Sequence, residues 1–348
     1  MATFDIATEY TLPDVLRHKA PNGDYMPAID VLSGKWPMME EGYWVQANDN
    51  TSHEYVRMAY EPTGSLVRYN EGTAFESAAT TVVREQLARL ESMLRIDTRI
   101  LKKAPDPVKY RRDMEAAHLR GMIKQWTKIV FGVRDTSSGP YYGDSGLDQK
   151  SIDGLETRYK NLTTSASLVD NVRSLGGSTS DVQSSIWLIK WGPNGLFFAY
   201  PADVGNTLTS RDLKEQVVYD TNTVPRPYTA VLTNFAFEFG IGVGDERAVQ
   251  RLANVATAQT VGSFGRDTDV TQGENAMIDM IERLPGGDPS GCVFYVGPPV
   301  MADVRKRLNS KSNMYFTTES VWGRPQITFM GVPVVRCDAL QPNEKVVS

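Results

Sequence analysis

The chain has few of the side chains that bind metals or form disulfides. Its 348 residues include only two cysteines, Cys292 and Cys337, and three histidines, His18, His53 and His118. Both cysteines lie in apolar runs typical of strands ("GCVFYV" and "PVVRCD"), so we expect buried thiols rather than a disulfide. Because the histidines lie in unrelated segments, the sequence predicts neither a zinc nor an iron site, and no cofactor.

Long apolar runs and a secretory leader are also missing. No run approaches the roughly 20 apolar residues that cross a bilayer. The start, "MATFDIATEYTLPD", carries acids where a signal peptide carries a basic end and an apolar stretch. We therefore expect a product of the cytoplasm with no membrane contact. Hydrophobic residues make up 41% and charged residues 23% of the chain, as in ordinary folded proteins.

Catalytic motifs are missing as well. "GIGVG" at 240–244 lacks both the dinucleotide spacing and a phosphate-binding lysine, and "GSFG" at 262–265 lacks the spacing of a nucleophile elbow. The acids Asp267 and Asp269 lack the rest of a calcium loop. His118 lies beside an apolar helical stripe with no partner in view, so a core or boundary position is favoured over a general base. The sequence predicts a protein that is not an enzyme.

Charge is distributed unevenly. Residues 82–134 hold 13 Lys and Arg against 6 Asp and Glu, so this segment carries +7 while the rest carries −12. Two interpretations stay open: the cations pair with acids of this chain or a neighbour, or they meet nucleic acid phosphates. Aromatic residues are sparse among these charges, where Tyr110 and Trp126 lie, which argues against base stacking.

The first third predicts an arm, a hairpin and a long helix. Residues 1–40 are punctuated by Pro and Gly and read as an extended arm. Residues 42–78 show period two, with "EPTG" as the turn and "SLVRYN" as the returning strand. Residues 83–101 fit a helical stripe or a strand, and periodicity alone favours the helix. Residues 107–131 predict a helix, because Asp106 can cap it, Pro107 suits its first position and Gly132 can end it.

The remainder mixes strands and helices without a βαβ rhythm, so the predicted fold class is α+β. "SSIWLIKWGPNGLFFAYP" predicts a hairpin around "GPNG", and a long strand through Phe235 to Phe239 should precede a helix capped by Asp245. A helix, the strand "CVFYV", a second helix and a closing pair, "FMGVPVV" with "NEKVV", follow.

This order of elements resembles the major capsid protein of tailed bacteriophages, with the Hong Kong 97-like (Johnson) capsid fold. The strongest local matches are "SSIWLIKWGPNGLFFAYP", "GDERAVQRLANV" and "WGRPQITFMGVPVVRCDALQPNEKVV". The resemblance implies that the stretch before Asp97 is a strand beside the long spine helix. It divides the chain as follows: N-arm 1–40, E-loop hairpin 41–78, peripheral domain with the spine helix 79–134, connecting loops 135–183, strands completing the peripheral domain 184–243, and axial domain 244–348.

The implied function is a coat protein that self-assembles, through pentamers and hexamers, into the icosahedral head around double-stranded DNA. Its implied place is the virion, assembled in the host cytoplasm, and its implied partners are a scaffolding protein, a portal and a decoration protein. An encapsulin shell and a cytosolic α+β enzyme remain alternatives. Since residues 42–78 contain no lysine, we expect no covalent crosslink from the E-loop. Because the chain begins directly at the arm, we expect scaffolding by a separate protein. The residues predicted to form inter-subunit ion pairs are Glu54, Arg57, Arg68 and Glu71.

Overall fold

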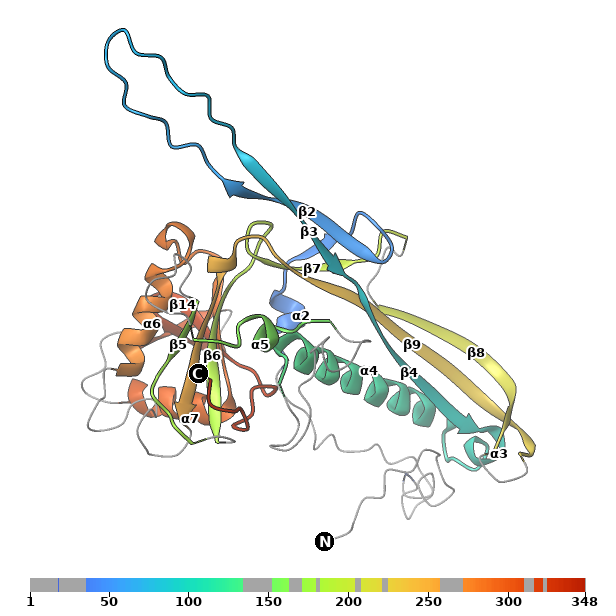
Figure 1. The fold of residues 1–348 in the computed structure, drawn as a ribbon. Coiled ribbons are helices and arrows are strands. Elements are labelled where there is room, and N and C mark those ends of the chain that lie inside the picture. Colours follow the sequence, from blue (N-terminus) through green and yellow to red (C-terminus); the bar gives the residue numbers. More distant parts are fainter. Residues whose placement is uncertain are drawn as a thin grey trace.

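One long helix lies between two β-sheets, and a narrow hairpin projects from their junction (Figure 1). The computed structural model describes residues 18, 36–133, 152–162, 171–179, 182–203, 208–220, 225–256, 272–309, 316–321 and 324–347. The helices are α2 (Met38–Glu41), α3 (Thr98–Leu101), α4 (Pro107–Phe131), α5 (Leu155–Arg158), α6 (Gln272–Glu282) and α7 (Pro298–Leu308), with 3-10 turns η1 (Glu246–Ala248) and η2 (Pro285–Gly287). The strands are β1 (Trp44–Gln46), β2 (Ser52–Tyr60), β3 (Ala79–Gln86), β4 (Ala88–Asp97), β5 (Val172–Ser174), β6 (Gln183–Lys190), β7 (Leu196–Tyr200), β8 (Leu208–Tyr219), β9 (Pro227–Val243), β10 (Val249–Ala256), β11 (Cys292–Val296), β12 (Phe316–Val321), β13 (Arg324–Phe329) and β14 (Val332–Arg336).

The helix α4 begins and ends where the sequence predicts. The Asp106 carboxylate accepts hydrogen bonds from the backbone N–H groups of Val108 and Lys109, both at 3.1 Å. Gly132 ends the helix in the left-handed conformation, with φ of 77°. At 25 residues the helix is about 37 Å long, which suits it to bridge two sheets.

The five-stranded sheet is built around β9, which is 17 residues long. Its first part pairs with β4 on one side and β8 on the other, and its last part pairs with β7, which pairs with β1. Trp126 of α4 packs edge-on against Phe198 and Phe237 of this sheet. The strand β4 confirms the strand interpretation of the stretch before Asp97, because alternate residues such as Leu94 and Ile96 are buried in the same core as α4.

The seven-stranded sheet has the order β12-β13-β14-β11-β6-β10-β5. One face, through Leu188 and Phe294, shares a core with α6 and α7. The other face, through Trp187 and Tyr295, contacts Phe131 at the end of α4. Since α4 packs on both sheets, it joins them into one hydrophobic core.

The structure corrects three predictions of local structure. The predicted helix after Asp245 is not present: the chain forms the short turn η1 and then the strand β10. All eight residues of β10 are buried in the middle of a sheet, and the apolar residues of such a strand can match helical spacing by chance. The turn at "GPNG" exists, but its flanking strands separate into different sheets rather than forming a hairpin. In the projecting hairpin, β2 pairs with β3 and not with "SLVRYN". The β-branched residues at 80–83 are the better strand formers.

Two further expectations need revision. The range 184–243 does not form one set of strands, because β6 lies in the seven-stranded sheet while β7, β8 and β9 lie in the five-stranded sheet. The chain end is not a closing strand: β14 is inside the sheet as predicted, but Glu344 makes only a single bridge to Gln183. The arm at 1–35 lies outside the described residues, apart from His18, whose ring lies 5.2 Å from that of Tyr110.

Candidate interaction site at the hairpin

The hairpin β2–β3 has one face toward the body of the molecule and one toward solvent. Its antiparallel register runs from Ser52–Gln86 to the bulge near Met58. Tyr55 and Arg57 are partly buried, whereas Val56 and Met58 are largely exposed, which agrees with the alternation predicted from the sequence. A two-stranded hairpin is marginally stable alone, so its position depends on what holds its base and what its far end meets.

The loop at 61–78, between the two strands, carries large apolar side chains with no cover. Leu66, Tyr69 and Phe75 are fully exposed to solvent. Figure 1 shows this loop extending away from both sheets. Soluble monomers rarely leave several large apolar side chains exposed on one element, and such a surface marks an interaction site.

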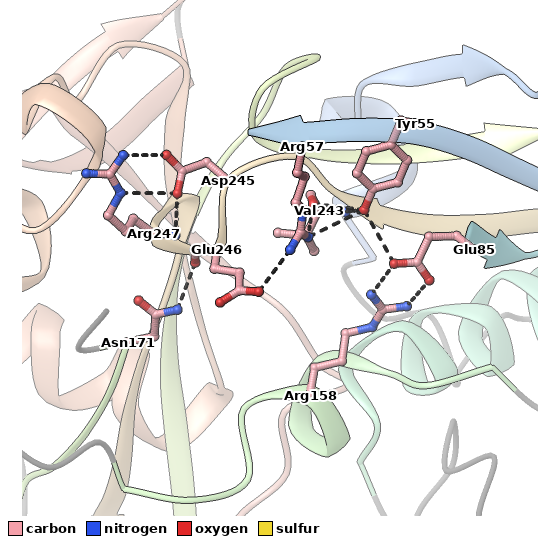
Figure 2. A network of polar contacts seen from close by, with 9 residues as sticks. All are labelled: Tyr55, Arg57, Glu85, Arg158, Asn171, Val243, Asp245, Glu246 and Arg247. Carbon is pink, nitrogen blue, oxygen red and sulfur yellow. Dashed lines mark hydrogen bonds and ion pairs between the residues drawn. The ribbon is translucent and has the colours of Figure 1, made fainter. Parts of the chain in front are cut away.

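The β2 side of the base is held by Tyr55 and Arg57 (Figure 2). The Tyr55 hydroxyl donates a hydrogen bond to the Val243 carbonyl oxygen at 2.9 Å. Arg57 pairs with the Glu246 carboxylate at 2.9 Å and also donates to the Val243 carbonyl. Burial raises the pKa of the Tyr55 hydroxyl. Burial alone would lower the pKa of the Arg57 guanidinium, but the nearby Tyr55 and Glu246 have the larger effect together and raise this pKa. Both groups keep their ordinary charge states at neutral pH.

The β3 side is held by Glu85, which receives two parallel hydrogen bonds from the Arg158 guanidinium at 2.7 and 2.8 Å. Arg158 belongs to α5 and is itself oriented by the Asp153 carbonyl at 2.9 Å. Burial lowers the pKa of Arg158, but the Glu85 carboxylate outweighs this and raises it above the usual value. A bidentate, charge-assisted pair is both strong and directional, so it fixes the angle of β3.

Between these two anchors lies a polar cleft of about 580 Å³. It is lined by residues of the hairpin, the end of β9, η1, the α5 region and the start of β5, among them Arg57, Glu85, Arg158, Tyr159, Asn171 and Glu246. One aromatic contact adds to the ion pairs, since Phe197 of β7 lies edge-on to the rings of His53 and Tyr55, both at 5.5 Å. The hairpin is therefore oriented at its base by a small number of specific contacts.

The structure does not bring the four predicted site residues together. Glu54 and Arg57 are near the base, where Glu54 pairs with Arg84 at 3.4 Å and Arg57 with Glu246. Arg68 and Glu71 lie in the loop, where the Glu71 carboxylate accepts a hydrogen bond from the Arg68 backbone N–H at 3.0 Å. Two of the four thus form ion pairs with other residues of their own chain, and the other two, which are hydrogen-bonded to each other, accompany the exposed apolar side chains.

Sequence reasoning missed Tyr55, Glu85, Arg158 and Glu246 as anchors. Tyr55 alone had a signal, its position on the inward side of a period-two strand. Glu85 and Arg158 are 73 residues apart, and no local pattern links them.

Other chemistry is sparse among the described residues. They contain no group of three His, Cys, Asp or Glu side chains placed to hold a metal ion. Cys292 and Cys337 are free and buried, as the sequence predicts, and burial raises their pKa values to about 11 and about 12. Within the described parts of the chain, no helix combines the length and apolarity needed to span a membrane.

The family model described as "Major capsid protein GP7" matches residues 20–348, nearly the whole chain. This chain belongs to that family. The capsid protein is therefore a major capsid protein of a tailed-phage head and a component of the virion. The encapsulin and enzyme alternatives are not favoured. None of the curated proteins matches this chain.

Solved structures agree in fold. The capsid protein is similar to a chain of bacteriophage Epsilon15, with 20% identity, a TM-score of 0.64 and coverage of 99% of both chains. It is more distantly similar to the capsid of bacteriophage JBD30, with 13% identity, a TM-score of 0.41 and coverage of 90% of this chain and 93% of that chain. A further likeness is to the SrpI encapsulin of Synechococcus elongatus, with 10% identity, a TM-score of 0.43 and coverage of 74% of this chain and 97% of that chain. The Epsilon15 match shows that this mixed α+β fold is a phage capsid fold; the other two are too weak to carry an argument.

Proposed function

We propose that the capsid protein assembles through pentamers and hexamers into an icosahedral shell in which each hairpin lies on a neighbouring subunit. One observation carries this proposal: the loop at 61–78 exposes Leu66, Tyr69 and Phe75 completely, while the base of the hairpin is firmly anchored. An anchored strand pair with an uncovered apolar end is suited to bury that end against another copy. Repetition around closed rings makes many weak contacts strong together.

The finer division follows the capsid fold. In this proposal, 1–40 is the N-arm and 41–78 the E-loop, whose strands the structure continues to Gln86. The five-stranded sheet with α4 is the peripheral domain, and the seven-stranded sheet is the axial domain near the capsomer centre. Residues 135–183 connect the two, with α5 as an anchor of the hairpin.

Charged contacts between subunits complement the apolar loop. Arg68 and Glu71 are proposed to pair with a neighbour, because they lie beside the exposed apolar side chains. We propose the same role for Glu54 and Arg57. Their charges also form ion pairs within the chain, Glu54 with Arg84 and Arg57 with Glu246. Each exposed pair contributes less than about 1 kcal/mol, so the apolar contacts carry most of the association.

The remaining partners are proposals from the capsid role: a scaffolding protein, a portal, a decoration protein and packaged double-stranded DNA. No catalytic activity and no E-loop crosslink are proposed. The absence of lysine from 42–78 supports the second statement.

The test is a double substitution in the loop, Leu66→Ser with Phe75→Ser. Since both side chains are fully exposed, the variant should keep the wild-type circular dichroism and melting temperature but lose shells and rings in sedimentation. The matched control is Met93→Ser with Val108→Ser, two exposed apolar side chains on separate elements, which should assemble normally. Wild-type shell yield from the loop variant would overturn the proposal. An Arg68→Glu variant should hinder assembly in the same assay.

A further inference from the structure

The structure divides the basic segment at 82–134 into cations that are paired and cations that are not. Five of its six acids each hold a cation: Glu85 holds Arg158, Glu91 holds Arg89, Asp97 holds Arg99, Asp106 holds Lys109 and Glu115 holds Arg111. By contrast, Lys102, Lys103, Arg112 and Lys124 are exposed and form no ion pair with the described residues. The ion-pair interpretation of this segment therefore holds for part of its cations, and contact of the others with phosphates stays a prediction.

Arg112 and Lys124, the cations of α4 that form no ion pair with the described residues, lie on its exposed side together with Lys109 and Arg120. Met122 and Trp126, on the opposite side of the helix, are buried against the body of the molecule. At 100° per residue, Lys109, Arg120 and Lys124 lie within about 60° of one another on the solvent side, with Arg112 at its edge. All four are exposed, and Asp113 is the one acid on this face.

The chemistry of this face favours a polyanion. Between Lys109 and Lys128 it offers no exposed large apolar side chain, and the residues between its cations include Ala117 and Gly121. A protein segment docking here would lack the buried anchor that protein interfaces normally need. A row of charges on a rigid helix instead matches the closely spaced phosphates of a nucleic acid.

The same face argues for the backbone of a duplex rather than for unpaired bases. Tyr110, Trp126 and Phe131, the aromatic residues of α4, are 1%, 0% and 0% exposed. No aromatic side chain of this helix is thus available for base stacking, which binding of single strands normally uses.

We propose that the outward face of α4, through Arg112 and Lys124, contacts the phosphate backbone of double-stranded DNA without reading its sequence. This inference rests on the proposed function, in which DNA fills the shell, and it assigns the contact to one surface. Binding through two such charges should be weak for one subunit and should accumulate over many subunits of the shell.

The test measures binding of the purified chain to a fluorescent 30-base-pair duplex at several salt concentrations between about 50 and 200 mM. The Arg112→Glu/Lys124→Glu variant should bind at least tenfold more weakly at the lowest salt, and its log–log salt slope should be smaller by about 2, since each phosphate contact contributes ~0.9. The matched control is Arg211→Glu/Arg305→Glu, two exposed arginines without an ion pair among the described residues, and it should bind like the wild type.

Wild-type affinity and slope in the α4 variant would overturn the inference, as would an equal loss in the control. Sedimentation of the same variants separates this result from the capsid role. Shells from an α4 variant that still binds DNA normally would refute only the DNA surface, whereas absence of shells from the wild type would refute the proposed function. An α4 variant that binds DNA normally but fails to assemble with its scaffold would assign the face to a protein partner and also overturn the inference.

Discussion

At the scale of single residues, Arg251 of β10 is held by several partners and is fully buried. Its guanidinium contacts the carboxylates of Glu344 at 2.9 Å and Glu156 at 3.2 Å, and it lies 5.0 Å from the ring of Trp187. Burial lowers the pKa of Arg251, but the two carboxylates outweigh this and raise it. The cluster ties β10 to both α5 and the last residues of the chain. Asn254 adds to this tie, since its side chain accepts from the Val347 N–H at 2.8 Å and donates to the Val347 carbonyl at 2.9 Å.

We predict that Arg251→Ala lowers the free energy of unfolding by about 3–5 kcal/mol, because it leaves two buried carboxylates without their cation. Urea unfolding of the unassembled chain measures this. The control is Arg247→Ala, whose pair with Asp245 is half-exposed and should contribute less than about 1 kcal/mol. Equal losses in the two variants would contradict the account of the cluster.

At the scale of elements, the sequence predicted α4 to the residue because its signals are local: a cap at Asp106, Pro107 and a terminal glycine. The strands were harder to predict. Every residue of β10 is buried, so the spacing of its apolar residues fits a helix as well as a central strand. The pairing of this segment with β6 and β5 is what makes it a strand. Likewise, "GPNG" specifies a turn but not which sheet each flanking strand joins.

The hairpin illustrates the same limit at the candidate site. Period two correctly assigned Tyr55 and Arg57 to one face, since alternation is a property of the strand itself. The partners of these two side chains come from β9 and η1, between 186 and 189 residues away in sequence, and the partner of Glu85 comes from α5, 73 residues away. Such contacts depend on the arrangement of the two sheets and have no local sequence signal.

We predict that Arg158→Ala loosens the hairpin without unfolding the sheets. Loss of the bidentate pair leaves Glu85 partly buried without its cation, which should cost about 1–3 kcal/mol locally. Hydrogen exchange of backbone amides in β2 and β3 should become several-fold faster, while exchange in β9 stays the same. The control is Arg84→Ala, since the pair between Arg84 and Glu54 is exposed. Unchanged exchange in the Arg158 variant would mean that this pair does not hold the hairpin.

At the scale of the whole molecule, the two sheets share one core through α4, and the hairpin is the part that this core does not support. The charged side chains likewise divide into those with a partner in the chain and those without an ion pair among the described residues. Asp106 and Glu115 pair with Lys109 and Arg111, whereas Arg112 and Lys124 of α4 are exposed and form no ion pair with the described residues, in a chain whose net charge is −5. A molecule of this shape leaves its hairpin loop uncovered, as the proposed contact with another copy requires.

The central claim is that this uncovered loop lies on a neighbouring subunit in the shell. A cryo-electron microscopy reconstruction of assembled particles tests it most directly, because it shows which subunit surrounds each hairpin. The account predicts that Leu66, Tyr69 and Phe75 are buried against an adjacent copy in closed icosahedral shells. Shells in which the loop folds back onto its own chain, or remains exposed, would contradict it.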